Sequence, residues 1–401
     1  MRYFLLIIFA IPFCLSAQWR IDDQPMYNDA NNGGRHHPIT FALDGVGYSL
    51  TGANGNDDFT SDMYKFDATT GTWELIGNFP GGVRGFAISD TFNGKAYMGF
   101  GASTIFNRDL WSFDPSTNEF TRLADCPGNS RLHPAFVAEA GKIVVGWGNN
   151  SQVGNMNDFW MYDIASDTWE KMPDPPAPPR HHPFMFGIDG VVYVGLGHGT
   201  ENGNLKIYND FYKWEIGVSV VWEKMDDFPG EARVAGTQFN FGGKGYVLSG
   251  HGDDHWNTEY GDFWEYDPGT NTWDSLPPHP GISSRWAPGN FVIDSRVYLL
   301  GGQLVTEQLT SVVNSFPLAA SSVENEEILA MEEQPRLSGK TVFIPEQWLE
   351  ASNSVTVFDL NGRPVVSEAL NSNEINLSSL NRGTYLLAGA DGQRVWKFQM
   401  N

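Results

Sequence analysis

Residues 131–179 of this 401-residue chain contain the unit that decides the fold. They open with Arg-Leu-His-Pro at 131–134 and continue through the apolar run Ile-Val-Val-Gly-Trp-Gly at 143–148. Asp-Phe-Trp-Met-Tyr-Asp follows at 158–163, and Thr-Trp-Glu-Lys-Met-Pro at 168–173 leads into a proline-rich turn. Glycine, proline, asparagine and aspartate separate the apolar runs, as they do between short β-strands. The stretch therefore predicts four short strands joined by tight turns.

The same unit recurs along the chain with a nearly fixed period. Its opening arginine returns every 47 to 53 residues, at Arg35, Arg84, Arg131, Arg180, Arg233 and Arg285. The glycine that ends the second strand recurs at Gly52, Gly101, Gly148, Gly197, Gly250 and Gly302. An aspartate two residues before an aromatic recurs at Asp62, Asp109, Asp158, Asp210 and Asp262. An aromatic begins the fourth strand at Trp73, Phe120, Trp169, Trp222 and Trp273. A period near fifty residues indicates repeated β-units in a propeller or a solenoid.

These columns resemble the kelch repeat over residues 18–318. The resemblance implies an all-β fold, a six-bladed kelch β-propeller in which each repeat forms one four-stranded blade. The glycine pair usual in kelch repeats stands only at Gly301-Gly302. In the other repeats the first position holds Thr51, Phe100, Trp147, Leu196 or Ser249.

The two ends of the repeat region predict how the ring closes. The segment that begins at Trp19 resembles the start of the fourth strand at Trp169. The last repeat supplies strands at 291–293 and 297–300, and a third at 312–316, but no fourth. We expect the N-terminal segment to complete this blade, because joining both ends in one sheet leaves no open edge.

The sequence outside the repeats predicts export. Residues 1–17 have the charged start, apolar run and small-residue end of a secretory signal peptide. Residues 319–336 are acidic and predict a solvated linker. Residues 337–401 predict a separate small β-sandwich of immunoglobulin-like type, with a two-residue hairpin turn at Asn361-Gly362.

This last domain resembles the C-terminal sorting domain of the type IX secretion system. The resemblance is carried by Val-Phe-Asp-Leu-Asn-Gly-Arg at 357–363, by Leu-Asn-Arg-Gly-Thr-Tyr at 380–385 and by Lys397. It implies recognition by the type IX secretion machinery, and a protein that is secreted or held at the outer-membrane surface of a Gram-negative bacterium. An ordinary immunoglobulin-like accessory domain is the alternative.

Composition narrows the range of partners and cofactors. The net charge of −23 argues against nucleic acid, which requires a basic surface. Of the two cysteines, Cys14 lies in the leader, so Cys126 is expected to be buried and without a disulfide partner. We expect a monomer with no transmembrane segment in the mature form.

The candidate ligand-binding residues lie where loops are predicted to gather on one face of the propeller. They are the six repeated arginines, the histidines two residues after three of them (His37, His133, His182), and the histidines that follow two column glycines (His198, His251). Because the side-chain period along a strand is two, arginine and histidine are expected to point the same way. An arginine-lined mouth suits carboxylates, and Trp147, Trp256 and Trp286 are candidates for stacking on sugar rings. The alternative is that the arginines bond loop carbonyls or the column aspartates between blades and serve the fold.

We expect no cofactor and no metal. Three histidines can hold zinc, but these come from blades expected to be far apart, and no His-x-His spacing occurs.

The sequence therefore predicts a secreted or cell-surface kelch propeller that binds a carbohydrate or peptide ligand on the loop face around the central channel. One alternative is an isomerase like the sialic-acid mutarotases, which resemble this chain at the repeat level and would need an arginine clamp. Another is a protein-interaction scaffold. Whether the chain is an enzyme is left open, with binding preferred.

Overall fold

The structure is a computed structural model of a chain that divides into two compact units, Met1–Ser321 and Ser322–Asn401. It describes residues 19–22, 24–29, 33–55, 58–252, 261–281, 284–318, 336–338, 340–344, 354–359, 364–369, 374–380, 382–389 and 395–400. The expected signal peptide, residues 319–335 of the expected linker, the turn at 361–362 and Trp256 lie outside these ranges. No helix in the described ranges is long and apolar enough to cross a membrane.

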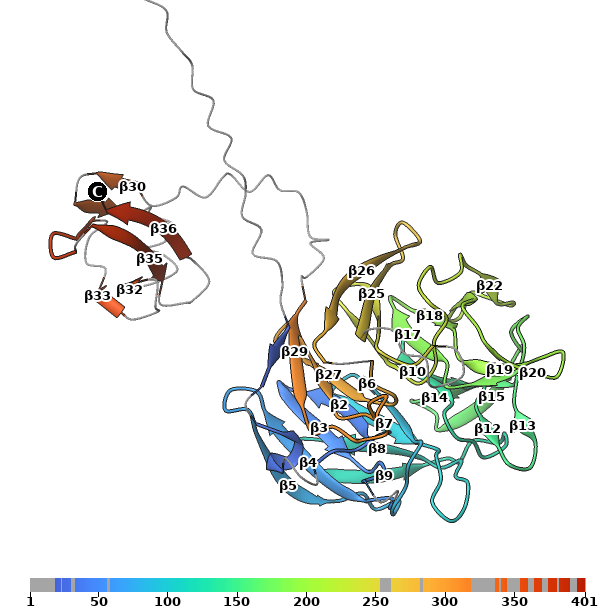
Figure 1. Ribbon diagram of the computed structural model, residues 1–401. Coiled ribbons are helices and arrows are strands. Elements are labelled where there is room, and N and C mark those ends of the chain that lie inside the picture. The colour runs from blue at the N-terminus through green and yellow to red at the C-terminus, as the bar shows by residue number, and fades with distance from the viewer. Residues whose placement is uncertain are drawn as a thin grey trace, which may run out of the picture. The chain divides into compact units, whose positions relative to one another are not determined.

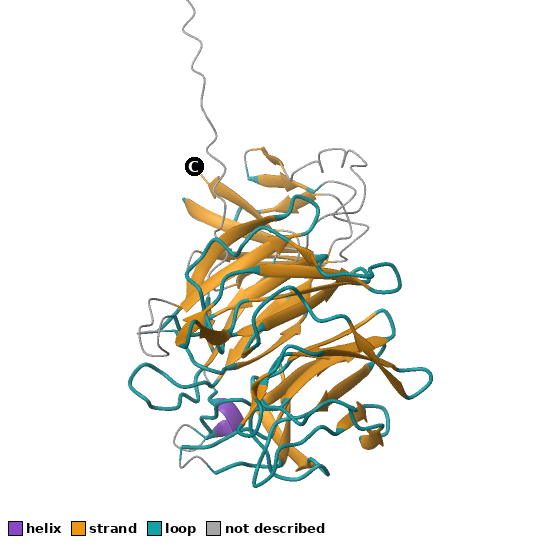
Figure 2. Ribbon diagram, turned by 90° about the vertical axis from the view of Figure 1, so that its right-hand side faces the viewer, coloured by secondary structure: helices purple, strands orange, loops and turns teal. Residues whose placement is uncertain are grey.

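Four-stranded antiparallel sheets build the first unit, and strands dominate both units (Figures 1 and 2). Blade 1 holds β2 (Ile39–Leu43), β3 (Val46–Leu50), β4 (Asp62–Asp67) and β5 (Thr72–Asn78). Blade 2 holds β6 (Ile88–Phe92), β7 (Lys95–Gly99), β8 (Leu110–Asp114) and β9 (Glu119–Leu123). Blade 3 holds β10 (Ala135–Glu139), β11 (Lys142–Gly146), β14 (Phe159–Asp163) and β15 (Thr168–Met172). Blade 4 holds β17 (Phe184–Ile188), β18 (Val191–Gly195), β21 (Phe211–Glu215) and β22 (Glu223–Lys224).

The remaining blades complete the ring, and small elements occur in the loops that connect the strands. Blade 5 holds β23 (Thr237–Phe241), β24 (Lys244–Leu248), β25 (Gly261–Asp267) and β26 (Thr272–His279). Blade 6 holds β27 (Gly289–Ile293), β28 (Arg296–Leu300), β29 (Val313–Pro317) and β1 (Arg20–Ile21). The small elements are the 3-10 turn η1 (Met26–Asn28), the pair β12 (Asn149–Asn150) and β13 (Gly154–Asn155), and the sheet of β16 (Arg180–His181), β19 (His198–Glu201) and β20 (Asn204–Ile207).

The N-terminal strand completes the last blade. Figure 1 shows β1, in dark blue, beside β29, in orange, and the two strands pair antiparallel. Trp19 Nε1 donates to the carbonyl of Pro277 in the preceding blade over 2.7 Å. Trp169 makes the corresponding bond to Ala124 over 2.8 Å. Trp19 therefore has in blade 6 the role that the repeated tryptophan has in blade 3.

The apolar core of the propeller lies between neighbouring blades. One cluster joins Val144 of blade 3 to Val192 and Trp214 of blade 4, and similar clusters fill the other blade junctions. The second strand of each blade therefore buries both faces, because every residue after the first is buried in β3, β7, β11, β18, β24 and β28. Burial on both faces explains why these strands are mostly apolar instead of alternating. Cys126 is fully buried in one of these clusters.

The repeated glycines join the blades through the backbone. Each column glycine donates its N–H to the carbonyl of the next blade's repeated arginine over 2.6–3.1 Å, and the circle closes from Gly302 to Arg35. These glycines have φ between +77° and +94°. At Gly148, a Cβ atom would lie only 2.7 Å from the carbonyl oxygen of Leu132. Only glycine fits such a position without strain.

The second unit contains two antiparallel sheets. One comprises β30 (Arg336–Ser338), β31 (Thr341–Phe343) and β34 (Glu374–Asn376), and the other β33 (Pro364–Ala369), β32 (Ser354–Asp359), β35 (Gly383–Gly389) and β36 (Val395–Met400). Val342 and Ile375 of the first sheet pack with Val355, Val357 and Leu387 of the second. The unit is therefore a β-sandwich with its core between the sheets, as expected.

Candidate functional site

The six repeated arginines lie inside the blades. Each of these residues is at most 6% exposed. Each Nη1 donates to the carbonyl of the residue sixteen positions later, just before the column glycine, over 2.9–3.2 Å. These carbonyls belong to Thr51, Phe100, Trp147, Leu196, Ser249 and Gly301. The guanidinium groups thus fix the turn that ends the second strand.

The column aspartates neutralise five of the arginines within the same blade. The ion pairs are Arg35–Asp62, Arg84–Asp109, Arg131–Asp158, Arg180–Asp210 and Arg233–Asp262. Burial alone would raise the pKa of Asp158, but Arg131 and the Trp160 indole N–H, which donates to this carboxylate, together outweigh burial and the pKa is lowered. The expectation that these arginines face a ligand is therefore corrected. Their donors are used inside the blade, as the structural alternative proposed, although within one blade and not between blades.

Blade 6 departs from this arrangement. Arg285 is 3% exposed, and its donors reach the carbonyls of Gly301 and Val312 and the side-chain oxygen of Asn314. Asn314 stands where the other blades have aspartate, two residues before the aromatic Phe316. Burial without a carboxylate lowers the pKa of Arg285 to about 9.

The residues two positions after each arginine form a ring around the channel. They are His37, Phe86, His133, His182, Ala235 and Ala287, and all have φ between +49° and +63°. Backbone hydrogen bonds link four pairs of them directly, from His37 to Ala287, His133 to Phe86, His182 to His133, and Ala287 to Ala235. The left-handed φ breaks the extended alternation. This is why arginine and histidine do not point the same way, contrary to the sequence expectation.

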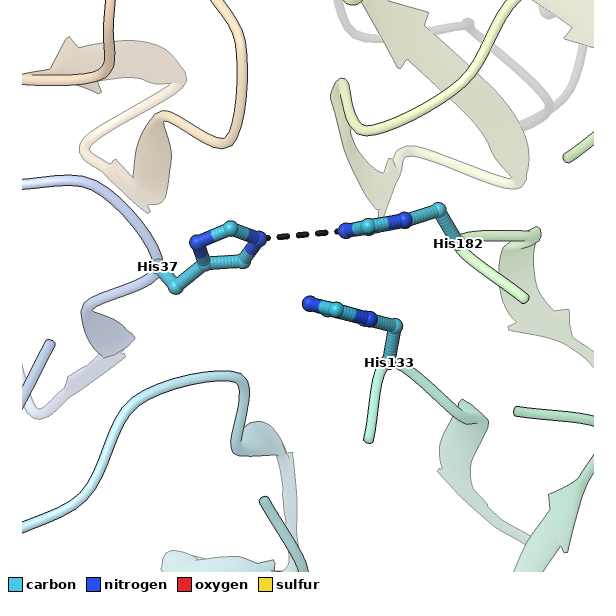
Figure 3. Close-up of side chains that lie close together, drawn as sticks. All are labelled: His37, His133 and His182. Carbon is cyan, nitrogen blue, oxygen red and sulfur yellow. Dashed lines mark hydrogen bonds between the residues drawn. The ribbon is translucent and has the colours of Figure 1, made fainter. Parts of the chain in front are cut away.

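Three imidazoles of this ring meet on the axis. His37, His133 and His182 each offer a ring nitrogen within 4.8 Å of the other two, and Figure 3 shows the rings converging from separate segments. His37 Nε2 lies 3.1 Å from His182 Nε2, although blades 1 and 4 are opposite in a six-bladed ring. The prediction that these histidines are too far apart to share a metal is therefore wrong. The residues two positions after each repeated arginine lie close to the propeller axis, where the blades converge.

The histidine cluster lies in a largely apolar, aromatic setting. His37 packs edge-on to Phe86 and Trp286, with ring centroids 4.7 and 4.5 Å away. Its Nδ1 lies 2.7 Å from Nδ1 of His36. Burial, with His133 and His36 nearby, holds the pKa of His37 well below its ordinary value, so this ring is neutral at pH 7.

The other two predicted histidines are not members of the cluster. His198 pairs in β19 with His181, the two rings are 4.9 Å apart, and the His181 ring lies 5.1 Å from that of His182. His251 forms a β-bridge with Val234 and is 5% exposed. Trp147 is fully buried against Arg180, so it is not available to stack on a sugar, whereas Trp286 lies beside the histidines.

A cavity of about 230 Å³ borders the histidine cluster, and the innermost strands of all six blades contribute to its wall. Hydroxyl and amide groups line it, from Thr40, Ser89, Thr91, Thr237, Gln238, Asn240 and Asn290. Lysine, arginine and glutamate are absent from its lining among the described residues. Sequence reasoning missed this wall, because its polar residues differ from blade to blade and form no repeated column.

Asp90 is the carboxylate in that wall. It stands at the third position of an innermost strand, where four blades carry Phe41, Phe186, Phe239 and Phe291. The backbone N–H groups of Ala138 and Thr91 donate to it over 2.8 and 2.7 Å. Burial nevertheless raises its pKa to about 7. An acid in a repeated aromatic column was the sequence signal that could have identified it.

The ring of four-stranded sheets, closed by the N-terminal strand, defines a β-propeller. Residues 124–302 match the family model of the KLHDC2/KLHL20/DRC7 Kelch-repeats domain, and residues 339–399 match the secretion system C-terminal sorting domain. Both resemblances seen in the sequence are therefore confirmed over these matched residues, the kelch repeat at 124–302 and the sorting domain at 339–399.

The other comparisons bear on the fold alone. The solved structure described as "Structure of YjhT" aligns with a TM-score of 0.51 at 17% sequence identity. The alignment covers 61% of this chain and 84% of that one. Among curated proteins, no sequence matches this chain.

Proposed function

We propose that this chain is exported through its sorting domain and binds a small neutral carbohydrate in the central channel of the propeller, at or beyond the cell surface. The observation that carries the proposal is the cavity on the axis, with its hydroxyl and amide wall and its lack of lysine and arginine among the described residues. Ligand pockets combine concave shape with a few convergent polar groups.

The size of the cavity restricts the ligand. About 230 Å³ is the space of roughly seven water molecules, which is the size range of one sugar ring. A folded partner does not fit there, and a long peptide would engage only by one terminal residue. The scaffold alternative receives less support from this cavity than small-molecule binding does.

The charge of the wall favours a neutral ligand. The isomerase alternative required arginines facing the mouth, but each repeated guanidinium lies inside its blade. A carboxylate in the cavity would meet Asp90 and no fixed positive side chain in the described wall. An acidic sugar is therefore disfavoured relative to a neutral one.

Saturation-transfer NMR on the full chain with matched neutral and acidic monosaccharides tests this. We expect a neutral sugar to bind, and Gln238→Leu and Ala235→Phe to weaken binding at least tenfold. Ala235→Phe introduces in blade 5 the residue that blade 2 carries at the same ring position, so the backbone tolerates it. The control is Lys206→Ala, an exposed residue of β20. Preferential binding of acidic sugars, or binding unaffected by both channel variants, would contradict the proposal.

A further inference from the structure

The three histidines of the channel ring have the spacing of a metal site. Each comes from a different blade, and their ring nitrogens all lie within 4.8 Å of one another. In a tetrahedral zinc site with Zn–N distances of about 2.0–2.1 Å, two nitrogens lie roughly 3.3 Å apart. The pair formed by His37 Nε2 and His182 Nε2, at 3.1 Å, is already close to this separation.

We propose that His37, His133 and His182 together bind one transition-metal ion, with Zn²⁺ the first candidate, where the blades converge on the channel axis. Imidazole nitrogen suits zinc, copper and nickel, whereas calcium and magnesium require oxygen ligands. The described cluster consists of histidines alone.

Hydrogen bonds fix the backbone of the three ligands before any ion binds. The His37 N–H donates to Ala287 over 2.8 Å, and the His182 N–H donates to His133 over 3.1 Å. These bonds belong to the ring that joins the blades. Ligands on such a rigid frame lose little freedom when they coordinate an ion.

A second contact orients His37. Its Nδ1 lies 2.7 Å from Nδ1 of His36. When the His37 Nδ1 proton is donated to His36, the Nε2 lone pair is left for the ion, which is the usual arrangement of a ligating imidazole. The ion would replace the present Nε2–Nε2 hydrogen bond between His37 and His182.

One adjustment is required for coordination. The His133 and His182 rings are stacked, with centroids 3.5 Å apart and planes 25° apart. Their lone pairs converge on one ion only if one ring tilts about its side-chain torsions. Three protein ligands then leave a fourth tetrahedral position for water or a ligand oxygen, and all three histidines border the cavity.

Metal titration of the full chain, made without a polyhistidine tag and stripped with EDTA, tests the proposal. Calorimetry is expected to show one equivalent of Zn²⁺ bound. Co²⁺ is expected to give the strong visible absorption of a four-coordinate site. His37→Ala, His133→Ala and His182→Ala should each weaken binding at least tenfold and abolish that absorption. Zn²⁺ should raise the unfolding temperature of the wild type and not of these variants.

The control is His198→Ala, which removes a buried histidine outside the cluster and should leave binding unchanged. Circular dichroism and metal-free thermal unfolding verify that each variant is folded. If an alanine variant does not fold, glutamine replaces the histidine at that position instead. Wild-type protein that binds no equivalent, or binding that survives in all three cluster variants, overturns the proposal. Sugar binding measured in EDTA tests the proposed function separately, so either idea can fail alone.

Discussion

Blade 6 offers the sharpest test of how the propeller is held together. Arg285 is buried like the other repeated arginines, but Asn314 replaces its carboxylate. The substitution Asn314→Asp restores the pattern of the other five blades. We expect it to stabilise the protein, although the chain already has a net charge of −23.

The pKa of Arg285 gives the magnitude. A fall from the ordinary 12.5 to about 9 corresponds to about 5 kcal/mol of penalty on the charged form. This is an upper bound, because the new carboxylate must also be desolvated and interior screening weakens the attraction. A gain of about 1 to 3 kcal/mol in the free energy of unfolding is expected, or roughly 2 to 5 °C in Tm for a propeller of this size.

Denaturant unfolding of the full chain measures the difference. Asn118→Asp, at an exposed turn, adds the same charge away from any buried arginine and serves as the control. The mirror substitution Asp109→Asn removes the partner of buried Arg84 and should cost about 2 to 3 kcal/mol. If Asn314→Asp is no more stable than Asn118→Asp, the argument from neutralisation of the buried guanidinium is refuted.

The pH dependence provides an independent check. A cation whose folded pKa is lowered carries its penalty below that pKa and loses it as pH rises through it. The advantage of Asn314→Asp over the wild type should therefore shrink between pH 8 and pH 10.5. An advantage that is constant or grows over this range would point to a cause other than Arg285.

Three further substitutions probe the channel wall, the backbone ring and the closure. Asp90 has a folded pKa of about 7 against an ordinary 3.8. The unfolded state therefore ionises first, and the wild type should lose stability as pH rises from 4 to 7, by up to about 1.4 kcal/mol per pH unit. Denaturant unfolding should show that Asp90→Asn removes this pH dependence. Gly148→Ala, where a Cβ meets the Leu132 carbonyl, should lower the free energy of unfolding by about 3 kcal/mol. Gly141→Ala, at a positive φ but in open space, should lower it by about 1 kcal/mol. Equal losses of stability would refute the steric argument. Trp19→Ala should cost about 2 kcal/mol and increase proteolysis at the N-terminus, and unchanged protease resistance would argue against closure by this strand.

The blade architecture was predictable because it is repeated. Arginine and glycine recur at the same place in all six units and aspartate in five of them, because each blade packs in the same way, and Trp19 could be recognised as a displaced member of the tryptophan column. The role of the arginines could not be predicted from their recurrence. A column shows that a position is needed, but not whether its side chain faces a ligand or a carbonyl sixteen residues later. Only the positions of the carbonyl and of Asp158 relative to Arg131 decide between these readings.

The channel ring shows why the site was not predicted from the sequence. The fold requires a left-handed φ and a backbone hydrogen bond at each ring position, and neither requirement specifies a side chain. Phe86, Ala287 and three histidines satisfy them equally well. A propeller can therefore carry functional side chains at these positions without losing stability, because the fold fixes the backbone conformation there and leaves the side chain free to vary. In this chain those side chains meet on the axis, and tests of function should start there rather than at the repeated arginines.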